Sequence, residues 1–591
     1  MTNNSYRVCD YIADRLYNYG VRNVYGLMGG GASGLNDGFI KNAKLNYVCF
    51  HHEQGAGHAA IGESKLTNKL SVVNPTTGCG GMNCATSVLN AWQDCCPVIF
   101  ISGNVRLNQT STWINKQKNI NLRKYGLQEH NIVETFGNMT KYSVFIQSVD
   151  DIAYELDKAI HIATTGRMGP VWIDIPGNIQ TAPMPDVYKT YEPEPLAVTI
   201  KQHQIDTVLS MISQAQRPLV LAGYGIHLSN TRTQFKQFIE QMQLPYVSTF
   251  NSRDLTANDH HLNIGNIGVK GSRSGNFAIQ NCDLLLVLGS SLNNSHVGYD
   301  EKIFAPTAEK IVVDIDENEI LKTNVDLGIV SDLRDFFNHC TDAKNDTDSY
   351  WLAKCLHWKN IWPVYQPQYR NDDAGINLYE LVKAFDTSMT SHDIIMTDAG
   401  SPSYVCPVAM DFKQDQKLIL SPSQGDMGWA VPGSIGVALN THNNVIVFVG
   451  DGSFYSNMQE LAVARYHKLP IKFVVANNKG YLSIKNTQTK FFQGRVHGVN
   501  GSTGLFFPDL QQAAKLFELG YARISNVQEL DDNFEQLIHC DQSMIIEVML
   551  KESQDILPTI ALLPSGKQGG LHELFPFLSD EELAREMLVK I

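Results

Sequence analysis

Short runs of apolar residues alternate along residues 1–185 with stretches in which apolar residues recur at helical spacing. The runs are rich in β-branched residues, as buried strands are, and most of them end near a glycine or a proline. They are NVYGLM, KLSVVNP, PVIFISG and PVWIDIP. Strands that alternate with helices predict a parallel sheet with helices on both of its faces.

Two further blocks, 200–345 and 370–555, repeat this pattern. Their predicted strands are RPLVLAGYG, LPYVSTF, DLLLVLGSS, KIVVDIDEN, DIIMTDAG, NVIVFVGDGSF and IKFVVANNKGY. The polar segments APMPDVYKTYEPEPLAV and DAKNDTDSYW are predicted to link the blocks. We therefore predict an α/β protein of three doubly wound parallel-sheet domains. A tail at 556–591 follows, which either closes over a site as a lid or packs against the protein.

Composition narrows the function classes. The chain has 591 residues, enough for several domains, and its net charge of −13 argues against a surface that binds nucleic acid. The first twenty residues have the pattern of an amphipathic helix without the apolar centre of a signal peptide. We find no apolar run long enough to span a membrane. We therefore expect a cytoplasmic protein with neither nucleic acid nor membrane as a partner.

Four cysteines lie close together in the sequence, at Cys79, Cys84, Cys95 and Cys96. Their spacing contains no CxxC pair, which zinc sites normally require. Cysteine is among the most frequently buried residue types, so we expect these four residues to be buried free thiols.

The sequence GDGSF, at 450–454, follows a predicted buried strand. Asn478 lies 27 residues after Asp451 (478 − 451), beyond a helix and a second strand. A βαβ unit of this length returns the chain to the same edge of the sheet, so we expect Asp451 and Asn478 to meet there. Carboxylate and amide oxygens suit Mg²⁺, which leaves further positions for phosphate oxygens. A helix predicted to start after Gly452 would point its free N–H groups at the same anion.

This stretch resembles the diphosphate-binding motif of thiamine diphosphate (ThDP) enzymes, and other segments resemble that superfamily too. They are YVCFHHEQGAGHAAIGESKLT, VVNPTTGCGGMNCATSVLNAWQDCCPVIFISG, TTGRMGPVWIDIPGNIQ and SQGDMGWAVPGSIG. The order of the segments resembles that of the acetolactate synthase and pyruvate oxidase group, which implies pyrimidine-binding, central and diphosphate-binding domains. The resemblance implies Asp451, Asn478 and the Gly480 carbonyl as Mg²⁺ ligands. The residues that it implies as binding ThDP are Gly30, Gly31, Glu53, Gly78, Asn83, Met427, Gly450, Gly452, Ser453 and Asn478.

The resemblance also implies catalytic roles. Glu53 would bind N1′ of the aminopyrimidine and so help the neighbouring N4′ to take the proton from thiazolium C2. Met427 would bend the cofactor so that these atoms meet, because methionine is apolar and adaptable and Gly428 allows close approach. LRKYGLQEHNIVE resembles the segment that places Gln128 near the reacting carbonyl, and YGLMGGGASGL resembles the glycine-rich loop beside the substrate, with Gly30 and Gly31.

The implied reaction is that of a carboligase. It decarboxylates a 2-oxo acid, pyruvate, and transfers the two-carbon unit to a carbonyl acceptor, a second 2-oxo acid giving acetolactate. In such families the glutamate of one subunit faces the diphosphate domain of another, which implies a homodimer or homotetramer. Four alternatives stay open: a relative that acts on a keto-sugar nucleotide, a 2-oxo acid decarboxylase, an oxidase and a non-catalytic relative.

Flavin binding is left open by the sequence. Where acetolactate synthases carry an RFDDR-like segment that contacts FAD, this chain reads GSSLNNSHVG. Both arginines and both aspartates of that pattern are missing. If FAD binds, we expect it near the glycine turns at Gly268 and Gly271, without a part in electron transfer.

Overall fold

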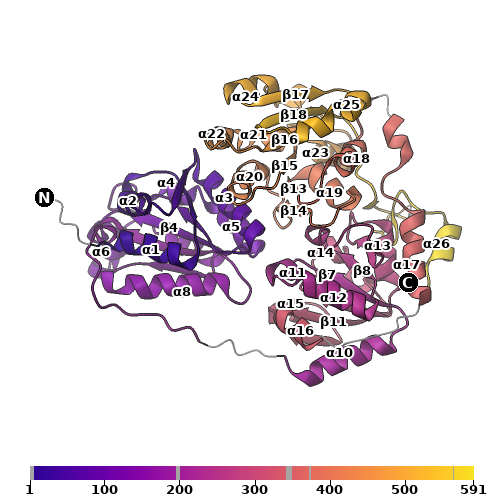
Figure 1. Cartoon of the computed structure of the whole chain (residues 1–591), viewed down its shortest axis with the longest axis horizontal. Coiled ribbons are helices and arrows are strands. Elements are labelled where there is room, and N and C mark those ends of the chain that lie inside the picture. The colour runs from indigo at the N-terminus through magenta and orange to yellow at the C-terminus, as the bar shows by residue number, and fades with distance from the viewer. Residues whose placement is uncertain (1–5, 195–199, 341–348, 372–373, 564, 591) are drawn as a thin grey trace.

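The computed structural model describes residues 6–194, 200–340, 349–371, 374–563 and 565–590. Its core consists of three six-stranded sheets, and every strand pair in them is parallel. The sheets occupy separate parts of the sequence, as the alternating pattern predicts, and helices lie around each of them (Figure 1). The predicted fold class is confirmed. Parts of both predicted linkers, at 195–199 and 341–348, lie outside the described residues.

The first sheet has the order β2-β1-β3-β4-β6-β5. Its strands are β1 Asn23–Gly26, β2 Asn46–Cys49, β3 Ser71–Asn74, β4 Val98–Asn104, β5 Tyr142–Phe145 and β6 Val171–Pro176. Its helices are α1 Val8–Tyr19, α2 Ser33–Lys41, α3 Glu53–Thr67, α4 Cys79–Met82, α5 Ala85–Gln93, α6 Ser111–Lys118, α7 Ile132–Phe136, α8 Ile152–Thr164 and α9 Gly177–Gln180. The amphipathic pattern near the N-terminus is helix α1, whose apolar side chains enter the core.

The second sheet has the order β12-β11-β10-β7-β8-β9. Its strands are β7 Pro218–Ala222, β8 Tyr246–Ser248, β9 Asn263–Asn266, β10 Leu284–Leu288, β11 Glu309–Asp314 and β12 Leu327–Val330. Its helices are α10 Gln202–Gln214, α11 Gly225–Leu228, α12 Arg232–Met242, α13 Arg273–Asn281, α14 Asn294–Val297, α15 Glu317–Leu321, α16 Leu333–His339 and α17 Ser349–Ile361.

The third sheet has the order β14-β13-β15-β16-β18-β17. Its strands are β13 Ile394–Thr397, β14 Lys417–Leu420, β15 Val445–Gly450, β16 Lys472–Asn477, β17 Gly520–Ile524 and β18 Met544–Met549. Its helices are α18 Leu378–Ser388, α19 Gly400–Ala409, α20 Ala430–Ala438, α21 Asp451–Tyr455, α22 Leu461–Tyr466, α23 Leu482–Phe491, α24 Leu510–Leu516 and α25 Val527–Ile538. Strands β15 and β16 are neighbours, with Gly450 opposite Ala476, so the βαβ unit that the spacing predicts is present.

Helices α3 and α20 join the first and third domains (Figure 1). Their backbones touch at glycines. A Cβ atom on Gly62 would lie 2.1 Å from the Gly433 carbonyl oxygen, and one on Gly436 would lie 1.9 Å from that of Ala59. Apolar residues of both domains then share one buried cluster. Because no side chain fits between the two backbones, the start of α3 has a defined place relative to the third sheet.

The C-terminal tail packs against the central domain. It contains the antiparallel pair β19 Thr559–Ile560 and β20 Leu574–Phe575, followed by helix α26 Asp580–Glu586. Lys354 and Trp358 of α17 both donate to the Glu586 carboxylate, at 2.6 and 3.1 Å. Arg273 of α13 donates to the Pro576 carbonyl at 2.6 Å. The tail packs in this structure, and closure as a lid stays a prediction. No helix in the described ranges has the length and apolar character needed to cross a membrane.

Candidate functional site

Asp451 follows directly on strand β15, at the carboxyl edge of the third sheet. Its side chain is only 3% exposed. One carboxylate oxygen accepts the Gly480 N–H at 2.9 Å, and the other accepts the Gly452 N–H at 2.7 Å. Helix α21 already begins at Asp451 and has five residues, so the expectation of a helix that starts after Gly452 is wrong. Asp451 itself therefore lies in the first turn, with Gly450 as the N-cap.

Asn478 lies beyond the end of the neighbouring strand β16. Its buried Oδ1 has no hydrogen-bond partner within the described residues. An unsatisfied buried amide oxygen costs about 1–3 kcal/mol, so it calls for a ligand. Burial also raises the pKa of Asp451 to about 6, because a carboxylate without water is harder to ionise. A divalent cation would satisfy both groups, and the residues present fit Mg²⁺.

Asp451 and Asn478 line a cavity of about 250 Å³. Met427, Gly450, Gly452, Ser453 and Gly480 are also in its wall. Seven of the predicted residues therefore line one cavity.

Two glycines of this cavity have no room for a side chain. A Cβ atom on Gly452 would lie 1.9 Å from the Tyr481 ring, and one on Gly480 would lie 2.2 Å from the Val499 carbonyl oxygen. The backbone of Gly480 also has φ +153°, a conformation that L side chains rarely adopt.

The hydroxyl of Ser453 contacts the segment that carries Met427. It donates to Asp398 at 2.7 Å and accepts the Gly428 N–H at 2.8 Å. Sequence reasoning missed Asp398, although it follows the end of β13 much as Asp451 follows β15. Burial raises the pKa of Asp398 to about 6. Asp398 thus holds Ser453 and Gly428 in place behind the cavity.

A second group of predicted residues lies at the carboxyl edge of the first sheet. Glu53 is the first residue of helix α3 and is 4% exposed. The amide of Asn83 donates to its Oε2 at 2.9 Å. Gly78 has φ +56°, and a Cβ atom there would lie 2.3 Å from the carbonyl oxygen of Gln128. Four predicted residues thus form two touching pairs.

Gly30 and Gly31 lie in the loop that follows β1, in a short 3-10 helix. A Cβ atom on Gly31 would lie 2.2 Å from the side chain of Thr77, the residue before Gly78. Gly30 faces open space within the described part of the chain. The glycine-rich loop therefore packs beside the turn that contacts Gln128.

The two groups do not line a common cavity among the described residues. The residues described as lining the 250 Å³ cavity all belong to the third domain, and Glu53 is not among them. The domains nevertheless touch at Glu460, a buried residue that sequence reasoning missed. Its Oε2 accepts the N–H of His51 at 3.1 Å, two residues before Glu53.

Three of the four clustered cysteines are buried free thiols, as predicted. Cys79 is exposed, so the prediction is wrong for that residue. It begins the short helix α4, directly after Gly78, and is exposed there. Among the residues that the structure describes, no three His, Cys, Asp or Glu side chains gather as a metal site.

A further cavity, of about 470 Å³, lies where the three domains meet. Gly225, Gly289, Asp314 and Ser331 line it near the carboxyl ends of the central strands. Gly268 and Gly271 are not among its lining residues. A Cβ atom on either would lie 2.4 Å from backbone, so neither glycine has room for a side chain, and flavin binding near them stays a prediction.

Comparison with known proteins covers most of the chain. Residues 6–134 match the family described as "Thiamine pyrophosphate enzyme, N-terminal TPP binding domain". Residues 205–339 and 398–548 match its "central domain" and "C-terminal TPP binding domain".

Whole proteins are also similar. The chain is 30% identical over 574 residues to the acetolactate synthase large subunit of Lactococcus lactis subsp. lactis, covering 95% of this chain and 96% of that protein. The large subunit of acetolactate synthase isozyme 2 of Escherichia coli is 26% identical over 562 residues, with coverages of 94% and 97%. A probable acetolactate synthase large subunit of Methanocaldococcus jannaschii is 26% identical over 570 residues, with coverages of 93% and 92%.

Proposed function

This chain belongs to the thiamine pyrophosphate enzyme family as a relative of acetolactate synthase large subunits, and from that premise we propose a Mg²⁺-dependent carboligase. It decarboxylates a 2-oxo acid, pyruvate, and transfers the two-carbon unit to the carbonyl of a second 2-oxo acid. One observation carries the cation site. The unpartnered buried oxygen of Asn478 lies with the buried carboxylate of Asp451 at the same cavity.

The third domain binds the diphosphate end of the cofactor. Asp451, Asn478 and the Gly480 carbonyl would hold Mg²⁺, which would neutralise the phosphate charge. Gly450, Gly452 and Ser453 would place the start of α21 close to the phosphates, because Gly452 has no side chain to intervene. ThDP supplies a carbon nucleophile, C2 of its thiazolium ring, once that carbon has lost its proton.

The first domain supplies the acid–base groups. Glu53 is almost fully buried, and the amide of Asn83 orients its carboxylate. The carboxylate would then be able to bind a nitrogen of the aminopyrimidine ring. Gln128 contacts Gly78 through its backbone, and its amide is assigned to the reacting carbonyl. Gly30 and Gly31 border the substrate and leave it room. Met427 lines the same cavity and would bend the bound cofactor between its two rings.

The active site is completed by two copies of the chain. The cavity that contains Asp451 and Met427 is lined in this chain by third-domain residues, and Glu53 is not among them. We assign Glu53, Gln128, Gly30 and Gly31 to the first domain of a partner subunit. A homodimer is then the smallest active unit.

The test is product analysis with purified protein. Pyruvate with ThDP and Mg²⁺ is expected to give CO₂ and acetolactate in equal amounts. If acetaldehyde and CO₂ form without acetolactate, the enzyme is a decarboxylase and the carboligase proposal is wrong. If a ligation product forms only when a keto-sugar nucleotide is added, that compound is the acceptor in place of the 2-oxo acid.

A further inference from the structure

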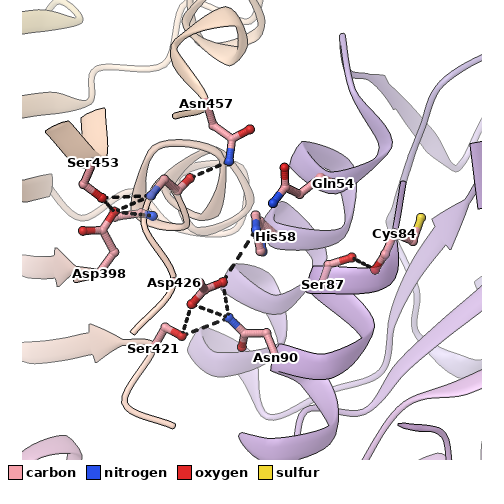
Figure 2. Close-up of polar contacts among 12 residues, drawn as sticks. Gln54, His58, Cys84, Ser87, Asn90, Asp398, Ser421, Asp426, Ser453 and Asn457 are labelled. Atoms are coloured by element: carbon pink, nitrogen blue, oxygen red, sulfur yellow. Dashed lines mark hydrogen bonds and ion pairs between the residues drawn. The ribbon is translucent and has the colours of Figure 1, made fainter. Parts of the chain in front are cut away.

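Met427 lies in a segment that connects strand β14 to helix α20. Its neighbour Asp426 turns toward the first domain (Figure 2). The amide of Asn90, on helix α5, donates to the two carboxylate oxygens of Asp426 at 3.0 and 2.9 Å. Asn90 also donates to the hydroxyl of Ser421 at 2.9 Å, and Ser421 donates to Asp426. One side of the Met427 segment is therefore attached to the first domain.

His58 faces the same carboxylate from helix α3. Its Nε2 lies 3.7 Å from Asp426 Oδ2, and its side chain is fully buried. Neither ring nitrogen makes a hydrogen bond within the described residues. His58 is five residues after Glu53 on the same helix (58 − 53). Asp426 therefore lies between the helix that begins with Glu53 and the segment that carries Met427.

The other side of the segment is attached to the third domain. The Gly428 N–H donates to Ser453, and Asn457 donates to the Gly428 carbonyl at 2.9 Å. Figure 2 shows these contacts on the side of the segment away from Asn90. Met427 thus lies between two attached residues, is 40% exposed, and lines the cavity.

Burying a carboxyl group at position 426 would cost free energy if the group served only to fill space. A largely buried carboxylate loses hydration, and its contacts recover that loss only when the partners are correctly placed. Such groups define one arrangement among several that pack equally well. Asn90, Ser421 and His58 all contact the same carboxylate, so they favour one position of the backbone before Met427.

We propose that Asp426, together with Asn90 and His58, is a positioning cluster that sets Met427 relative to the helix of Glu53. The proposal rests on the proposed function, because it gives Met427 its place against the cofactor rings. Asp426 acts through its neighbour and touches neither substrate nor cofactor. In a homodimer, the cluster would also link the Glu53 of one active site to the Met427 of the other.

The first test measures hydrogen–deuterium exchange at C2 of ThDP bound to the full-length protein. Asp426→Ala should slow this exchange by about ten- to a hundredfold, as expected when reacting groups are misplaced by about 1 Å. ThDP affinity, measured by calorimetry with Mg²⁺, should change much less, because Asp451 and Asn478 remain. Exchange at the wild-type rate in Asp426→Ala would overturn the proposal.

The matched control is Asn440→Ala. Asn440 follows helix α20 and accepts a hydrogen bond from Asn23 of the first domain at 3.2 Å, so it also links the two domains. It lies beyond the far end of α20 from Met427. If Asn440→Ala slows C2 exchange as much as Asp426→Ala does, the proposal is overturned. Any lost contact between the two domains would then have the same effect as loss of the cluster.

Rescue supplies the second test. Asn90→Asp places two carboxylates against each other and should slow C2 exchange. Adding Asp426→Asn restores an amide–carboxylate pair with the roles reversed, so the double variant should exchange faster than Asn90→Asp alone. If the effects of the two substitutions on the C2 exchange rate simply add, Asn90 and Asp426 do not act as a pair and the proposal is contradicted. Failure of the wild-type protein to bind ThDP at all would instead refute the proposed function, which separates the two.

Discussion

Replacing Glu460 by glutamine should change the way in which stability depends on pH. Glu460 is fully buried where the first and third domains meet, and it accepts the N–H of His51. Burial is the main cause that raises its pKa from 4.5 to about 7, and the nearby Glu53 carboxylate contributes in the same direction. The folded protein therefore keeps a proton on Glu460 at pH values at which the unfolded chain has released it.

The sign and the size follow from this difference. A carboxyl group whose pKa is raised by folding stabilises the protein at low pH, and this stability is lost as the pH rises through 7. With 4.5 for the unfolded chain and about 7 for the folded one, the loss between pH 5.5 and pH 8.5 is about 2 kcal/mol, at about 1.4 kcal/mol per pH unit. Glutamine does not titrate, so Glu460→Gln lacks this contribution.

The assay is urea unfolding of both proteins at pH 5.5 and pH 8.5. The free energy of unfolding of the variant minus that of the wild type should increase by about 2 kcal/mol from the lower to the higher pH. Other titrating groups are present in both proteins and cancel in this difference. Glu535→Gln, at an exposed position of α25, is the control and should show no such change. If the variant and the wild type differ in free energy of unfolding by the same amount at both pH values, the conclusion that folding raises the pKa of Glu460 is wrong.

Four further predictions concern the site and its support. Asp451→Ala should abolish cation-dependent ThDP binding, because it removes the anionic ligand beside Asn478; wild-type affinity in calorimetry would contradict the Mg²⁺ assignment. Glu53→Gln should bind ThDP but slow C2 exchange by about 10²-fold or more, as measured by NMR, because an amide cannot stabilise a protonated ring nitrogen; an unchanged rate would exclude Glu53 as the activating group. Gly436→Ala should lower the free energy of unfolding by about 1–3 kcal/mol, because its Cβ would lie 1.9 Å from a backbone oxygen of α3, whereas Gly137→Ala, which faces open space, should not; equal effects would argue against the helix contact. Turnover should be independent of flavin reduction, since carboligation transfers no net electrons; bleaching of a bound flavin at the rate of turnover, on anaerobic mixing with pyruvate, would identify an oxidase.

The sequence alone determined the fold class and the order of the three domains. Apolar runs that end at glycine turns predict parallel strands, because such strands are buried on both faces and leave the sheet at one edge. Strand β18 was missed, although it pairs with a strand on each side in the third sheet, because Glu547 interrupts its apolar run. In the structure Arg523 and Asn477 donate to that carboxylate, at 2.8 and 2.5 Å, which makes its burial possible. A local pattern contains no information about partners that lie in other strands.

The sequence also placed Asp451 and Asn478 at one edge, because a βαβ unit has a nearly constant geometry. Only the tertiary structure brought Asp426 to Asn90 and His58, and Glu460 to the start of the Glu53 helix. These residues are hundreds of positions apart, and their meeting depends on how α3 packs against α20. That packing is decided by backbone contact at Gly62 and Gly436, where the absence of a side chain matters and no periodic pattern marks it. Interactions within a supersecondary unit can be predicted from spacing, whereas interactions between domains exist only once two surfaces have fitted together.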